Sequence, residues 1–232
     1  MKHAAISGAA ALLASLLVSV AWAQNAEKAG ASNAATSAAT KTAGKETTSS
    51  TLINGPETHF RAARTAFDKG DLGAAGHDIR QGAALIRIEA NRSNITDETD
   101  LLTSAAELET LAGNVAQGSV SSPYDLSRAF ARADLALARH YHMLAQESLH
   151  QKNTKEAAVW LGAATDYVND SVAWNSRQLE ESGSPVVKKM RALQKSLQEK
   201  ISAGTQAASQ ETARGLDALG KDLQQLAQKI SP

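Results

Sequence analysis

The sequence has no cysteine, which excludes a disulfide framework and also a lipid-attachment cysteine behind an export signal. Aromatic residues are scarce, at 4% of the 232 residues, and there are only four prolines. Basic and acidic residues both number 24, so no excess of positive charge favours nucleic acid as a partner. Beyond the N-terminus no apolar run approaches the ~20 residues of a membrane span. We therefore expect neither a nucleic-acid partner nor an integral membrane segment after signal cleavage.

Catalytic motifs are missing as well. The sequence has no G-x-S-x-G pattern and no phosphate-binding glycine loop, and its glycines are scattered singly. With no cysteine nucleophile either, we expect a protein that is not an enzyme and that needs no cofactor.

The first residues carry the three parts of a secretory signal. Lys2 and His3 precede a short apolar stretch, and this stretch ends in an Ala-x-Ala sequence at 21–23. The alternative is an uncleaved membrane anchor, but the stretch is short and is interrupted by serine and glycine. We therefore expect residues 1–23 to be a signal peptide, cleaved before Gln24, and the protein to be periplasmic.

Residues 24–53 are mostly alanine, threonine, serine, lysine and glycine, with few large apolar side chains. Such a segment cannot bury enough surface to offset the entropy lost on ordering. We expect a disordered low-complexity linker that limited proteolysis would remove.

From residue 54 onward, apolar residues recur at steps of three and four, which is the spacing of one helix face. Polar breaks separate these stripes, and Pro56, Pro123 and Pro185 are each expected in the first turn of a helix. The fold class is therefore predicted to be all-α, a bundle of antiparallel helical hairpins over 54–183. An amphipathic C-terminal helical segment is expected over 184–232.

Two hairpins in this pattern look alike. When Phe67 is set against Leu149, the apolar positions of 60–90 and 144–172 largely coincide, and both turns are short and polar. Amphipathic helices also produce such agreement by chance, so an internal duplication stays open.

One of these turns carries a resemblance. The run of residues 62–71, which ends in Lys-Gly-Asp and is followed by Ala74 and Ala75, resembles the turn of a tetratricopeptide-type hairpin. In composition and plan the whole chain is similar to secreted YfdX-type Ala-rich helical proteins. That resemblance implies an exported protein with a stress-related role, and it brings no catalytic residues with it.

Three aromatic residues of the fifth expected helix, Trp160, Tyr167 and Trp174, are spaced by seven and so share one face. They are candidates for a ligand or partner surface, because tryptophan and tyrosine combine large contact area with a polar group. The alternative is that they pack against a neighbouring helix in the core.

A metal site is a weaker candidate. His142, Glu147 and His150 lie near one another in sequence, and the last two form a Glu-x-x-His motif. Di-metal bundles need two such motifs on different helices, and the sequence has one. Ordinary surface or half-buried histidines are the favoured interpretation.

The C-terminal segment ends in a regular apolar stripe made of Leu216, Leu219, Leu223, Leu226 and Ile230. The stripe is expected to pack less tightly than the preceding stripe at 186–201. It is a candidate for self-association or for a protein partner, and the alternative is that it forms the last core helix of the monomer.

These features together favour a non-enzymatic exported helical protein that acts through protein-protein contacts, in a stress-related or chaperone-like role. The alternative is a helical bundle that binds a small ligand or a metal.

Overall fold

A computed structural model describes residues 55–92, 98–204 and 210–230. These residues form seven α-helices and no strand, which confirms the predicted all-α bundle. Within the described ranges, no helix combines the length and the apolar character needed to cross a bilayer. The predicted signal peptide at 1–23 and the predicted linker at 24–53 lie outside the described residues.

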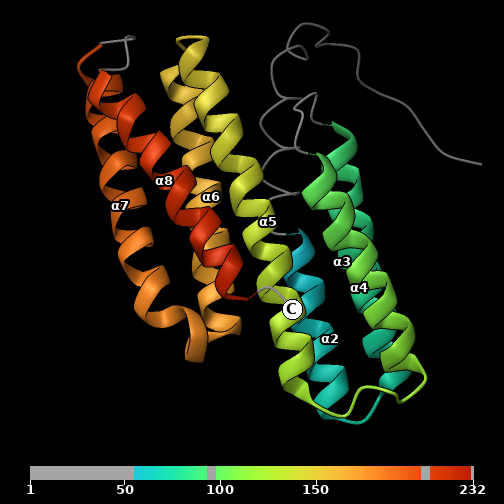
Figure 1. Cartoon of the computed structure of the whole chain (residues 1–232). Coiled ribbons are helices and arrows are strands. Elements are labelled where there is room, and N and C mark those ends of the chain that lie inside the picture. The colour runs from blue at the N-terminus through green and yellow to red at the C-terminus, as the bar shows by residue number, and fades with distance from the viewer. Residues whose placement is uncertain (1–54, 93–97, 205–209, 231–232) are drawn as a thin grey trace, which may run out of the picture. The chain divides into compact units, whose positions relative to one another are not determined.

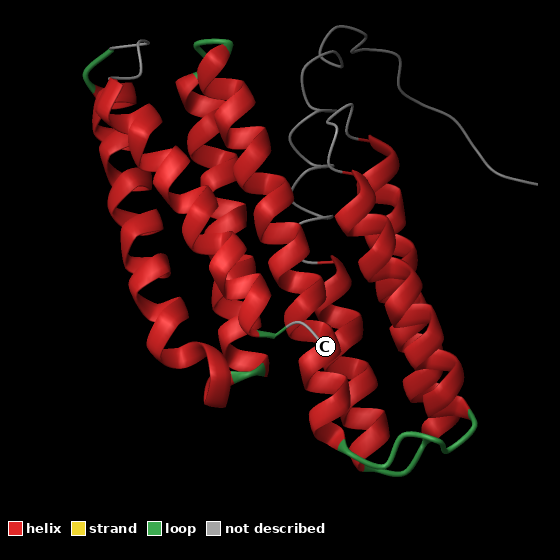
Figure 2. Cartoon of the chain, viewed as in Figure 1, coloured by secondary structure: helices red, strands yellow, loops and turns green. Residues whose placement is uncertain are grey.

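The helices follow one another as hairpins (Figures 1 and 2). Their bounds are α2 Gly55–Asp68, α3 Leu72–Arg92, α4 Glu98–Ala116, α5 Pro123–His150, α6 Thr154–Trp174, α7 Ser176–Ser202 and α8 Gln210–Lys229. Each expected apolar stripe falls on a single helix, and the stripe residues are largely buried. The structure differs from the sequence prediction in where α7 begins.

The longest helix, α5, connects the two ends of the bundle. It contacts α2 and α4 as well as α6 and α8, as Figure 1 also shows. Its buried side runs from Leu126 to Leu149. Ser122 caps its first turn by accepting a hydrogen bond from the backbone N–H of Tyr124, and Pro123 follows at once, as predicted.

The turn between α2 and α3 depends on glycine. Gly70 has a φ of +79°, a left-handed conformation that ends α2. The N–H of Asp71 then donates to the carbonyl of Ala66 at 3.0 Å. Its side chain accepts from the N–H of Ala74, also at 3.0 Å, and so caps α3.

The turn between α5 and α6 is built in the same way. Lys152 takes the left-handed position, with a φ of +61°. Asn153 donates to the carbonyl of Ser148 at 2.7 Å, and its side chain accepts from the N–H of Glu156 at 3.3 Å. The two turns thus correspond residue by residue in the alignment that the sequence indicated. The end of α4 at Gly118 has the same kind of turn, although α4 is not part of either hairpin in the alignment. The likeness of the two turns therefore does not by itself establish a duplication, which stays open.

The prediction that Pro185 opens a helix is wrong. Helix α6 ends earlier, at Trp174, and Pro185 lies inside α7, so the expected boundary between 183 and 184 falls within a continuous helix. Proline costs the helix one backbone hydrogen bond, but Val186 and Val187 are both buried. Gly183 also lets α7 approach Val172 of α6 closely. Packing therefore outweighs the local turn propensity.

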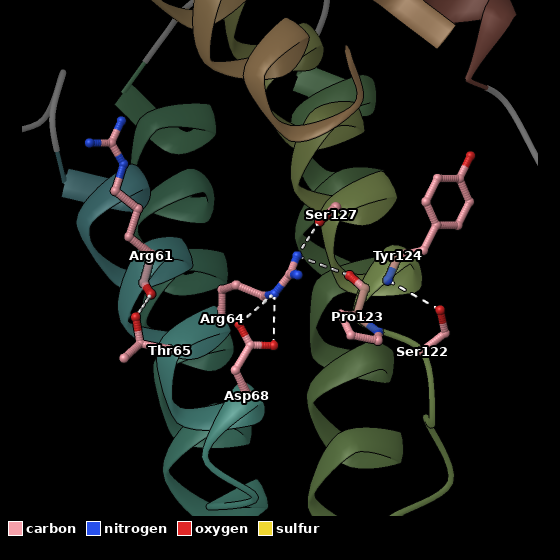
Figure 3. Close-up of polar contacts among 8 residues, drawn as sticks. All are labelled: Arg61, Arg64, Thr65, Asp68, Ser122, Pro123, Tyr124 and Ser127. Atoms are coloured by element: carbon pink, nitrogen blue, oxygen red, sulfur yellow. Dashed lines mark hydrogen bonds and ion pairs between the residues drawn. The ribbon is translucent and has the colours of Figure 1, made fainter. Parts of the chain in front are cut away.

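Arg64 makes polar contacts between α2 and α5 (Figure 3). Arg64 donates to the hydroxyl of Ser127 at 2.6 Å and to the carbonyl of Pro123 at 3.3 Å. Both oxygens of Asp68 lie 3.1 Å from its Nε and keep the guanidinium in place. Contacts of this kind set how α2, which carries part of the site described below, lies against α5.

Close packing of α3 on α4 yields a first testable expectation. A Cβ on Gly76 would lie 2.8 Å from the backbone oxygen of Ala112, whereas a Cβ on Gly113 would meet nothing within 4 Å. We expect Gly76→Ala to lower the free energy of unfolding by about 1–3 kcal/mol. Gly113→Ala should raise it by roughly 0.5–1 kcal/mol, because alanine is the better helix former. Urea unfolding of both variants measures this, and two changes of the same sign would contradict the close approach.

Candidate functional site

Five side chains from three helices meet where α2, α5 and α6 come together. Glu57 and Arg61 are on α2, Asp134 is on α5, and Asp170 and Trp174 are on α6. Within α2 and within α6 the two residues are four apart, so each pair shares one helix face. We call Glu57, Asp134 and Asp170 the carboxylate cluster.

Arg61 joins two of the three carboxylates. Its Nε donates to Glu57 Oε1 at 2.8 Å, and its Nη2 donates to Asp170 Oδ1 at 3.1 Å. The indole N–H of Trp174 donates to the second oxygen of Glu57 at 3.3 Å. The side chain of Glu57 is only 9% exposed, whereas that of Arg61 is 65% exposed. The arginine therefore covers the outer end of the cluster.

Asp134 forms the inner end of the cluster. It is wholly buried, and within the described part of the chain neither of its carboxyl oxygens has a hydrogen-bond partner. Burying a polar group without a partner costs free energy, and an ionised carboxylate costs more than a neutral one. An unpartnered carboxyl in a core is therefore a place to look for function.

All three carboxyl groups hold their protons more firmly than usual. Burial is the main reason that the pKa of Asp134 is well above its ordinary value, and the charges of Glu57 and Asp170 raise it further. Burial also raises the pKa of Glu57 and the pKa of Asp170, although Arg61 opposes both shifts. The cluster can therefore take up protons, or it can gain a cation that relieves the repulsion among its charges.

A second polar contact involves α5. His140 of α5 is buried, and its Nε2 lies 3.8 Å from Oε1 of Glu89 on α3. The ring of His140 meets that of Tyr141 edge-on, with 5.3 Å between centroids. This pair connects α3 to α5 in the core.

Sequence reasoning missed the carboxylate cluster. Its contacts join residues 109 and 117 positions apart, and only the packing of the helices brings these together. One signal was present, however. Asp134 lies four residues after Phe130 and seven before Tyr141, so it falls within the apolar stripe of α5.

The predicted aromatic face lies between α5 and α6. Trp160 and Tyr167 both stack on Tyr141, with ring centroids 5.5 and 5.6 Å apart, and Trp174 meets Phe130 edge-on at 5.1 Å. Tyr167 is buried, and the two tryptophans are partly buried against the core. The three residues are therefore mainly core, and Trp174 also donates a hydrogen bond to Glu57 of the carboxylate cluster.

The predicted self-association stripe belongs to the core of the monomer. Each of its five residues, Leu216, Leu219, Leu223, Leu226 and Ile230, is at most 2% exposed. Helix α8 packs on α5 and α7, and the expectation that this stripe is less tightly packed than the stripe at 186–201 is wrong. The regular heptad-like spacing of the stripe suits a core helix as well as an interface.

The structure does not bring the predicted metal ligands together. His142 is buried, and its Nε2 lies 2.8 Å from the backbone oxygen of Leu216 on α8. Glu147 and His150 are both exposed, and Glu147 accepts a hydrogen bond from Gln151. Among residues 55–92, 98–204 and 210–230, no three metal-binding side chains are grouped to hold an ion.

Comparisons with family models, with curated proteins and with solved structures found no match to this chain.

Proposed function

We propose that this chain is a non-enzymatic exported helical protein that acts through protein-protein contacts, in a stress-related or chaperone-like role. The observation that supports it best is the charge imbalance where α2 meets α6. Arg61 forms ion pairs with Glu57 and Asp170, whereas the nearby buried Asp134 has no hydrogen-bond partner among the described residues. A local excess of one charge beside a tryptophan favours a partner of opposite charge.

Export to the periplasm is part of the same proposal. Its support is the basic start, the short apolar stretch and the Ala-x-Ala sequence at 21–23. The resemblance to YfdX-type proteins, which rests on composition and plan, supports the stress-related role.

Capture from envelope extracts tests the proposal, followed by measurement with purified components. We expect at least one captured protein, once purified, to bind the chain saturably with a Kd in the micromolar range or tighter. We also expect the purified chain to slow the aggregation of a heat-unfolded client, compared with an unrelated helical protein at equal concentration. If no captured protein binds when purified and aggregation is not slowed, the proposed function is wrong.

A further inference from the structure

The carboxylate cluster has more negative than positive groups available to it. Arg61 pairs with Glu57 and Asp170 but not with Asp134. The charge of Asp166 also raises the pKa of Asp170, but Arg191 offsets the charge of Asp166. Carboxylates that crowd one another in this way gain from a further positive charge.

Asp134 is the carboxylate of the cluster that lacks a positively charged partner within the described part of the chain. Asp134 is wholly buried, both its oxygens lack a hydrogen-bond partner among the described residues, and the Glu57 and Asp170 charges act on it. Trp174 also acts on this carboxyl, although its N–H donates to Glu57. Asp134 is therefore the member of the cluster that gains most from a positively charged neighbour.

The outer arginine does not pair with Asp134. The guanidinium of Arg61 reaches Glu57 and Asp170, but most of its side chain stays in solvent and no hydrogen bond joins it to Asp134. The indole of Trp174 lies on one side of the same carboxylates. Carboxylates beside an aromatic ring are the surroundings that organic cations prefer in proteins.

We propose that the carboxylate cluster binds an organic cation, an ammonium or guanidinium group, which enters beside Trp174 and displaces Arg61 from Glu57 and Asp170. The cation is carried either by a small amine or by a lysine or arginine of the protein partner. In the second case this inference rests on the proposed function and specifies the chemistry of that partner.

Calorimetric titration of the full chain tests the site with three probes: agmatine, spermidine and a blocked Ala-Arg-Ala peptide. We expect saturable binding of at least one probe. Binding of the free amines indicates a small-molecule source, and binding of the peptide alone indicates a side chain of a protein. Either outcome supports the site.

Four variants separate this site from general acidity. Asp170→Asn and Asp134→Asn should each weaken binding about tenfold or more, because each removes one charge-assisted contact. Glu211→Gln, which neutralises an exposed carboxylate of α8, should leave binding unchanged. Arg61→Ala should tighten binding, because it removes the competing guanidinium.

A matched arginine variant controls for the loss of a surface charge. Arg87 forms an exposed ion pair with Glu109, 2.7 Å away, so Arg87→Ala removes a similar charge outside the cluster. If Arg87→Ala tightens binding as much as Arg61→Ala, or if no probe binds the wild type, the inference is overturned. If a purified partner protein binds the chain although no probe does, the proposed function is supported and the cation site is not. If a probe binds but no partner protein is found, the cation site is supported and the proposed function is not.

Discussion

A chain that ends at Gly204 should lose most of the stability of the bundle. The truncation removes α8, whose five stripe residues are almost completely buried against α5 and α7. Each large apolar side chain contributes about 1.5–3 kcal/mol on burial, so the loss approaches the ~5–15 kcal/mol that stabilises a typical domain. The buried ring of His142 also loses its contact with the carbonyl of Leu216. Thermal unfolding followed by circular dichroism should show a broad transition or none.

A single substitution gives the same test in milder form. Leu223→Ala should lower the free energy of unfolding by about 2–5 kcal/mol, because it leaves a cavity in the core. Gln225→Ala, at an exposed position of the same helix, should change it by less than about 0.5 kcal/mol. A truncated chain that melts normally but no longer dimerises would instead mean that the stripe is an interface.

Replacing Asp134 by asparagine should make the protein more stable near neutral pH and should flatten its pH dependence. The pKa of Asp134 is raised in the folded state, chiefly by burial and then by the charges of Glu57 and Asp170. Above about pH 4, where this carboxyl ionises in the unfolded chain, the folded state therefore binds more protons. The contribution of Asp134 to stability falls as the pH rises, until the pH passes its folded-state pKa.

Asparagine keeps the shape of Asp134 and removes the charge. We expect a gain on the order of 1–3 kcal/mol at neutral pH and little change near pH 4. His142 acts in the opposite direction, because burial lowers its pKa, but it is present in both proteins. Urea unfolding between pH 4 and pH 8 measures the difference.

The control for this prediction is Asp68→Asn, which neutralises an exposed carboxylate of α2. It should leave the pH dependence of stability close to that of the wild type. If Asp134→Asn is less stable than the wild type at neutral pH and keeps the same slope, Asp134 makes a favourable contact and is not an uncompensated buried acid.

The fold could be predicted because apolar spacing reflects which face of a helix is buried. Leu223, for example, falls on an expected stripe and is wholly buried. The start of α5 was equally readable from Pro123, which lies in its first turn. The polar run before Pro185 led to a wrong prediction of a helix start. Its residues favour a turn locally, but the packing of α7 on α6 depends on residues distant in sequence and keeps this segment helical.

The candidate site could not be predicted in the same way. Only Asp134 stands out in its own helix, as an acid within the apolar stripe of α5. The charges of Glu57, Asp134 and Asp170 interact only once three helices have packed. The aromatic spacing was correctly identified, but spacing alone does not separate a ring that packs in the core, such as Tyr167, from one that also contacts polar groups, such as Trp174.

The indole N–H signals of the tryptophans in a ¹⁵N-labelled chain test the cation site most directly. Trp174 donates to Glu57 within the site, whereas Trp160 stacks on Tyr141. On addition of agmatine, spermidine or the arginine peptide, the Trp174 signal should shift saturably and the Trp160 signal should not. The Trp174 shift should disappear in Asp170→Asn. A Trp174 signal that stays in place with every probe, or equal shifts at both tryptophans, would contradict a cation site at the carboxylate cluster.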